Sequence, residues 1–151
     1  MIYQKETWKD FWKDAESLFL LHDEELNSVL DEPYEINIEL FTLLEHYGNL
    51  NIQTAREDNK LIGYSIFYET PNLRSKSTKT ATQGPWFVRL EKRKTLVGPR
   101  LLLNSLTDLY SLGVKSIYLH HYPEISPKIE KFFNSLKADK TEIVYHLSLE
   151  K

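Results

Sequence analysis

A short basic stretch is the part of this sequence best suited to chemistry. It follows an extended run, precedes a leucine-rich amphipathic segment, and reads Arg93-Lys94-Thr95-Leu96-Val97-Gly98. The first turn of a helix has backbone N–H groups without partners and a partial positive charge, so it attracts phosphate. Gly98 allows close approach of the backbone, and Arg93, Lys94 and Arg100 add positive charge. The stretch could therefore hold a phosphate group; the equal alternative is a basic turn that merely precedes a helix.

A second set of residues could move protons or hold a polar substrate. Histidine titrates near neutral pH, and His120 and His121 stand at the end of a predicted strand. Neighbouring strand residues point to opposite faces, so at most one of the two faces a given site, and we favour His121. Glu69, at the end of another strand, is a second candidate base. His22 and Glu25 share a helix face and could bind substrate. The alternative in each case is a solvated surface group.

The hydrophobic pattern predicts the elements that position these residues. Helices are predicted at 7–22 and 35–47, from the basic stretch to Gly113, and at 127–136, with strands at 50–56, 61–68, 78–88, 114–119 and 142–149. The expected N-cap of the first helix is Thr7, the hairpin turn is Asp58-Asn59, and the first residue of the third helix is Pro99. Two strands joined by a crossover helix form a parallel unit inside an otherwise antiparallel sheet, with helices on both faces.

Composition limits the class of protein. The 151 residues suffice for one domain, predicted to span 1–151, and 41% of them are hydrophobic. The absence of cysteine excludes disulfides and a cysteine nucleophile, and no residue cluster has metal-ligand spacing, so no metal is predicted. A net charge of −3 gives no reason to expect a nucleic acid or an anionic membrane as partner. Without a signal peptide or a spanning segment, we expect a soluble cytoplasmic protein.

In order and spacing, these segments resemble the GNAT acetyltransferase superfamily. That family carries Arg/Gln-x-x-Gly-x-Gly/Ala between a strand and a helix, where this chain has Arg93 to Gly98. The family's hairpin resembles Asn59-Lys60-Leu61-Ile62-Gly63-Tyr64, and the entry to its fifth strand resembles Leu112-Gly113-Val114-Lys115-Ser116-Ile117-Tyr118. The resemblance implies an α/β fold of the mixed α+β kind. Its central sheet is mixed and mostly antiparallel, with helices on both faces and splayed parallel strands at the cofactor cleft.

A narrower resemblance, to phage-encoded GNAT proteins, covers nearly the whole chain. It rests on a tryptophan segment, a Leu-x-x-His-x-x-Glu helix and a Lys-Ser-Thr stretch, here Trp8, then Phe19, His22 and Glu25, then Lys76-Ser77-Thr78. The chain also departs from the superfamily pattern. Leucines replace the loop's first glycine and the usual preceding proline, a proline follows the loop, and two phenylalanines replace a helix tyrosine: Leu96, Leu90, Pro99 and Phe132-Phe133. These departures weaken the predicted phosphate site.

The resemblance implies an N-acyltransferase that moves an acetyl group from acetyl-CoA to an amine by direct attack. In the family the pantetheine arm lies along the fourth strand, which implies backbone contacts from Trp86, Phe87 and Val88. The implied phosphate-binding residues are Arg93, Lys94, Thr95, Leu96, Val97, Gly98 and Arg100. An attacking amine needs a base, for which His121 and Glu69 are candidates, and Tyr122 is a replacement proton donor to the thiolate. His22 and Glu25 would lie near the acceptor.

Two other functions remain open. In the first, the altered loop marks a non-catalytic GNAT-fold protein that binds or inhibits a partner, in the host cytoplasm if the protein is phage-encoded. In the second, the cations concentrated between residues 74 and 100, with Trp86 and Phe87 among them, bind nucleic acid; we rank this last. The sequence does not identify the acceptor, whether a small molecule or a protein amine, and leaves homodimerisation open.

Overall fold

A computed structural model describes residues 1–26, 35–122, 128–142 and 144. By their contacts the residues group into two compact units, Met1–His120 and His121–Lys151. The expected single domain over residues 1–151 remains a prediction.

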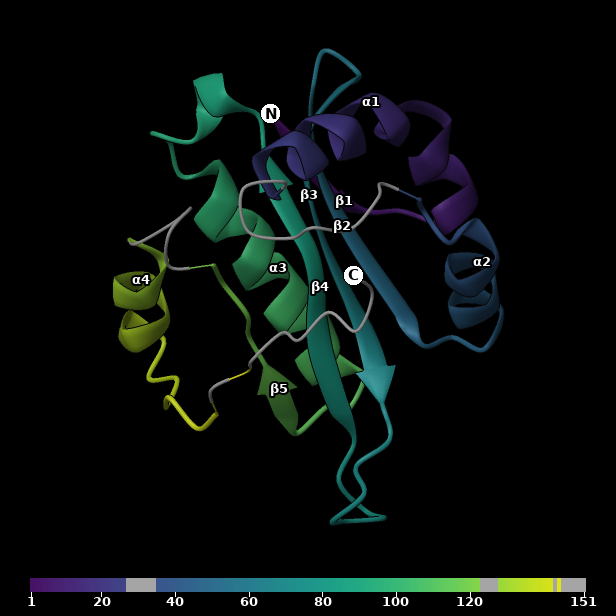
Figure 1. Ribbon diagram of the computed structural model, residues 1–151, viewed down its shortest axis with the longest axis vertical. Helices are drawn as coiled ribbons and strands as arrows, with labels where there is room; N and C mark the ends of the chain where they lie inside the picture. Colours follow the sequence, from purple (N-terminus) through teal and green to yellow (C-terminus); the bar gives the residue numbers. More distant parts are fainter. Residues whose placement is uncertain (27–34, 123–127, 143, 145–151) are drawn as a thin grey trace, which may run out of the picture. The chain divides into compact units, whose positions relative to one another are not determined.

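A five-stranded sheet forms the centre of the first unit (Figure 1). In space its order is β1-β2-β3-β4-β5, with bounds Ile2–Lys5, Leu50–Glu57, Lys60–Thr70, Thr80–Val88 and Ser116–Tyr118. The first four strands pair antiparallel, and β4 and β5 pair parallel. The mixed, mostly antiparallel sheet is therefore confirmed. The sequence analysis missed β1, which is only four residues long and lies in register with Gln53–Arg56 of β2.

The hairpin between β2 and β3 forms where the sequence predicts it. Glu57 pairs with Lys60, which leaves a loop of two residues, Asp58 and Asn59. Both have positive φ, 51° and 64°. Two consecutive left-handed residues give the turn the twist that matches the flanking strands, and Asp and Asn tolerate that conformation.

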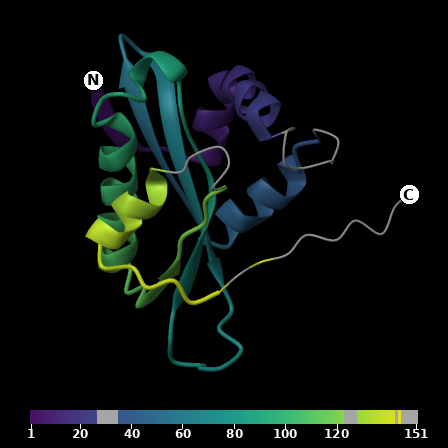
Figure 2. The same cartoon turned by 60° about the vertical axis from the view of Figure 1, so that its left-hand side comes forward.

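Helices cover both faces of the sheet, as predicted. Figure 2 shows α3 (Val97–Ser111) on one face and α1 (Trp8–Leu26) with α2 (Ile38–His46) on the other. The core under α1 contains buried residues at helical and strand spacing: Trp8, Phe11, Ala15, Leu18, Phe19, Ile52, Leu61, Tyr64, Ile66 and Phe87. The core under α3 is smaller: Ala55, Ile62, Val88, Val97 and Leu101. The first helix runs four residues past its predicted end at residue 22, and Glu25 in this last turn accepts a hydrogen bond from Arg93.

Three residues with special backbone or capping properties shape the start of α1, the packing of β3 and the first turn of α3. Thr7 is the N-cap of α1, as predicted, since its Oγ1 accepts from the Asp10 backbone N–H at 3.1 Å. Gly63 allows the hairpin to pack against β4, because a Cβ there would lie 2.7 Å from the Phe87 carbonyl oxygen. Pro99 was expected to be the first residue of α3, but it is the third. Its missing N–H is still one that the first turn of a helix leaves unbonded.

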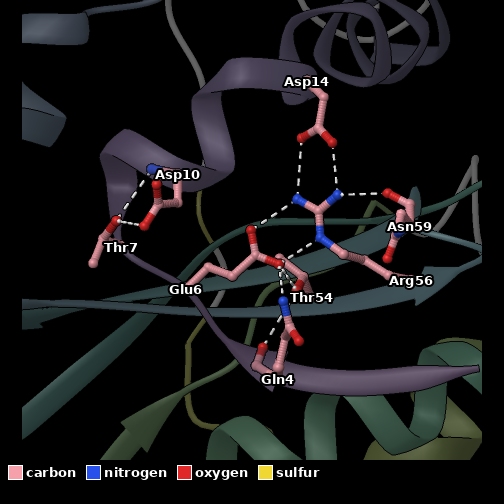
Figure 3. Close-up of polar contacts among 8 residues, drawn as sticks. All are labelled: Gln4, Glu6, Thr7, Asp10, Asp14, Thr54, Arg56 and Asn59. Carbon is pink, nitrogen blue, oxygen red and sulfur yellow. Dashed lines mark hydrogen bonds and ion pairs between the residues drawn. The ribbon is translucent and has the colours of Figure 1, made fainter.

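A half-buried ion network joins β2, α1 and Glu6, which lies between β1 and α1 (Figure 3). The Arg56 guanidinium donates to Glu6 at 2.6 and 2.8 Å and to Asp14 at 2.6 and 3.1 Å. Burial alone would raise the pKa of Glu6, but hydrogen bonds from Arg56, Thr54 and Gln4 together hold it below its usual value. The network therefore stabilises the fold most when Glu6 is ionised.

In the second unit, α4 spans Ile129–Ser135, and its Phe133 is buried. The helix predicted at 127–136 is therefore confirmed over its described part. The strand predicted at 142–149 lies mostly outside the described residues.

Candidate functional site

Strands β4 and β5 diverge after three residue pairs. The register runs from Thr80↔Ser116 to Thr82↔Tyr118, while β4 continues to Val88. Figure 1 shows β5 beside only one end of β4. In the described part of the chain, no strand pairs with this edge of β4 beyond Thr82. We call the region between Gln83–Val88 and Leu119 and His120, which follow β5 in the same unit, the fork; it is the splay that the GNAT resemblance implies.

The edge of β4 that faces the fork presents backbone groups. The Arg89 N–H donates to the Ile62 carbonyl of β3 at 3.0 Å. Since backbone groups alternate direction along an antiparallel strand, those of Val88 and Trp86 point away from β3 and toward the fork. A bulge precedes them, because Gly84 and Pro85 together lie opposite Ile66 alone. An extended ligand could add to this edge as a further strand would.

The turn after β4 supplies free backbone donors at the end of the fork. It passes through a 3₁₀ turn, Leu90–Lys92, before α3 begins after Leu96. Among the described residues, no hydrogen bond uses the N–H of Lys94, Leu96 or Gly98. The Val97 N–H makes only a long bond, 3.3 Å, to Thr95 Oγ1. Together with the helix partial charge, these donors suit an anion such as a pyrophosphate.

The unusual leucine of this turn does not fill the interior. Leu96 is 63% exposed, so its side chain projects into solvent. Gly98 packs on β4, since a Cβ there would contact Trp86 Cζ2 at 3.5 Å. The departures from the family pattern therefore change side chains at the turn while leaving several of its N–H groups unbonded.

Arg93 is held by three neighbours. Its Nε donates to the Val88 carbonyl at 2.7 Å, its Nη2 donates to Glu25 Oε1 at 2.7 Å, and its guanidinium lies over the Phe87 ring at 4.8 Å. It thus joins α1 to the end of β4. By contrast, Lys94 and Arg100 are exposed and make no ion pair with any residue that the structure describes. They are the cations of this turn best placed to meet a phosphate.

His22 lies against the sheet beside Arg93. Its Nδ1 is 2.9 Å from the Tyr64 hydroxyl, and its ring is 4.9 Å from that of Phe87. Desolvation, and then the nearby Arg93 charge, lower the pKa of His22 to about 4. At neutral pH the imidazole is therefore uncharged. The structure places His22 and Glu25 next to the predicted phosphate turn, and their role toward an acceptor stays a prediction.

The candidate bases and the proton donor belong to different units of the structure. Glu69 lies opposite Ala81, on the paired part of the sheet, and forms a 2.8 Å ion pair with Lys79. His121 and Tyr122 belong to the second unit, where the His121 ring packs edge-on against Phe133 at 5.8 Å. Their catalytic roles stay predictions.

Sequence reasoning missed Gln83. This β4 residue is only 8% exposed, and its Nε2 donates to the His120 carbonyl at 3.1 Å. A glutamine inside a predicted strand was the available signal, but its partner follows a crossover helix and cannot be read from spacing.

Comparisons with solved structures test the architecture. No family model matches the chain, and no curated protein is similar to it in sequence. An aminoglycoside acetyltransferase from an uncultured soil metagenomic sample, in complex with trehalose, superposes with a TM-score of 0.74. It shares 14% identity, over 99% of this chain and 96% of that one. The chain has the GNAT acetyltransferase fold.

Two further structures agree. A ribosomal-protein-alanine N-acetyltransferase from Brucella melitensis gives a TM-score of 0.72 at 13% identity, over 99% of this chain and all of that one (100%). A predicted acetyltransferase from Clostridium acetobutylicum, solved with acetyl-CoA, gives 0.72 at 15% identity, over 98% and 96%. Such identities establish the fold alone, and the resemblance to phage-encoded proteins stays a prediction. No helix in the described ranges is long and apolar enough to cross a membrane.

Proposed function

We propose that this GNAT-fold protein is an N-acyltransferase that moves an acetyl group from acetyl-CoA to an amine. The observation that carries the proposal is the continuity between the fork and the turn after β4. The edge of β4 beyond Thr82, with which no strand of the described residues pairs, lies next to the N–H groups of the turn that are unbonded among those residues. Phosphates on the turn and a pantetheine arm along β4 would occupy these two features together.

In this proposal the chain's residues bind, orient and move protons. When bound, acetyl-CoA supplies an activated acetyl group whose carbonyl carbon the amine attacks. An outward N–H of β4 near the end of the arm stabilises the negative charge that develops on the carbonyl oxygen. His121 or Glu69 takes the proton of the attacking amine, and Tyr122 donates one to the leaving thiolate. No covalent bond to the protein forms.

Binding is the first test. At a hundred times its dissociation constant, acetyl-CoA would stabilise the fold by about 2.7 kcal/mol, which a thermal shift detects. Lys94→Ala and Arg100→Ala should each weaken acetyl-CoA binding, measured by calorimetry, because both cations face solvent at the turn. The matched control is Lys60→Ala, an exposed cation in the hairpin between β2 and β3. The absence of any shift at millimolar acetyl-CoA would refute the proposal.

Turnover is the second test. Thiol release from acetyl-CoA, measured over a panel of small-molecule amines and amine-bearing peptides, should identify an acceptor. The proposal places the reaction in the cytoplasm and leaves the acceptor class open between these two groups.

A non-catalytic binding protein on the GNAT fold is the second candidate. Two observations favour it. Arg93 already donates hydrogen bonds to Glu25 and the Val88 carbonyl, and Leu96 and Pro99 depart from the family motif at the turn. Binding of acetyl-CoA without turnover for any amine would favour this candidate.

A further inference from the structure

Gln83 bridges β4 and β5 just past the last strand pair. The backbone ladder ends at Thr82↔Tyr118, and the Gln83 side-chain amide then reaches across to the His120 carbonyl at 3.1 Å. A carbonyl can only accept, so the group facing His120 must be the amide nitrogen, and the orientation of the amide is fixed. The bridge therefore closes the fork at its narrow end.

The other half of the amide has no partner in the described part of the chain. Gln83 Oε1 is buried and accepts no hydrogen bond from any residue that the structure describes. Among the described residues, the amide is therefore held by its hydrogen bond to the His120 carbonyl alone.

The direction of the proposed ligand brings its reactive end to this bridge. The phosphates would lie at the turn that follows Val88, and the arm would run along the β4 edge toward Gln83. Five residues of strand separate Val88 from Gln83, roughly 16 Å of extended chain. The acyl group of the thioester, at the far end of the arm, would then point toward the amide.

We infer that Gln83 limits the length of the acyl group that the fork accepts. Its side chain, hydrogen-bonded to the His120 carbonyl, would contact the methyl group of a bound acetyl group and leave no room beyond it. A longer apolar acyl chain would have to displace the amide and break its hydrogen bond to the His120 carbonyl. This inference rests on the proposed function and adds acyl-chain selectivity to it.

Calorimetric binding of three compounds tests the inference: acetyl-CoA, butyryl-CoA and the adenosine bisphosphate portion of coenzyme A, which lacks the arm. The wild-type protein should bind acetyl-CoA about tenfold more tightly than butyryl-CoA. In Gln83→Ala, butyryl-CoA should gain about tenfold relative to acetyl-CoA, because its two additional methylenes would fill the vacated space. Binding of the nucleotide should not change.

Asn51→Ala is the matched control. Asn51 is also a buried amide, 3% exposed, whose Nδ2 donates to Asp108 and whose Oδ1 has no partner among the described residues. It lies on β2, two strands away from the fork, so this variant should keep the wild-type preference.

Each outcome decides the question. Equal binding of acetyl-CoA and butyryl-CoA by the wild-type protein overturns the inference without any variant having to fold. An unchanged preference in a Gln83→Ala protein that still binds the nucleotide overturns it as well, while leaving the proposed function intact. If the wild-type protein binds none of the three compounds, the proposed function fails and the inference falls with it.

Discussion

His22 should make the stability of this protein sensitive to mild acid. Its pKa is lowered from 6.5 to about 4 in the folded chain, because the imidazole is desolvated and lies near Arg93. As the pH falls below 6.5, His22 binds a proton in the unfolded chain, whereas in the folded chain it stays neutral until the pH approaches 4. The contribution of His22 to stability is therefore complete above that pH and declines as the pH falls toward 4.

The size of the effect follows from the two pKa values. Between pH 7 and pH 5, linkage gives a loss of about 2 kcal/mol from this histidine alone. His22→Gln removes the titration and keeps a polar side chain beside the Tyr64 hydroxyl. Urea unfolding at both pH values should show that the variant loses about 2 kcal/mol less than the wild-type protein does.

An exposed histidine provides the control. His46→Gln, at the end of α2, should reproduce the wild-type pH dependence. If His22→Gln and the wild-type protein lose the same stability between pH 7 and pH 5, the imidazole is not held neutral by its surroundings. The account of the α1 contact with the sheet would then be wrong.

Three other changes test the packing, the ion network and the turn. Gly63→Ala should destabilise the fold by about 1–3 kcal/mol in urea unfolding, because its Cβ would meet the Phe87 carbonyl; a neutral result would contradict the observed strand spacing. Glu6→Gln should cost about 2–3 kcal/mol at pH 7, since it leaves Arg56 with less charge compensation. The wild-type advantage should shrink as the pH falls below 4.5, through the lowered folded pKa of Glu6, and a constant difference down to pH 2 would refute this. Leu96→Gly should tighten acetyl-CoA binding severalfold in calorimetry by clearing the turn; weaker binding would mean that the leucine itself contacts the ligand.

Local signals in the sequence predicted most of the fold. The Asp58-Asn59 turn, the Thr7 cap and the apolar spacing of α1 depend on neighbours within a few residues, and each is confirmed. The strand β1 was missed because four residues carry too little periodicity, and only its pairing with β2 makes it a strand.

The candidate site was harder to predict because its contacts join distant segments. Arg93 was expected to face phosphate, but Glu25, 68 residues earlier in the chain, holds its guanidinium. The partner of Gln83 follows a crossover helix, so the bridge across the fork has no signature in local spacing. In both cases the position of the polar side chain depends on a partner that is distant in the sequence.

The departures from the family motif bear less on binding than the sequence suggests. A motif records side chains, whereas the donors at this turn are backbone N–H groups, which every residue except proline carries. Leu96 has such a group, and it is unbonded among the described residues while the side chain points outward. Pro99 removes a donor from the third position of α3, but Lys94 and Gly98 keep theirs. A turn with an altered motif can therefore still present clustered donors, and an altered side chain here tunes access to them more than it removes them.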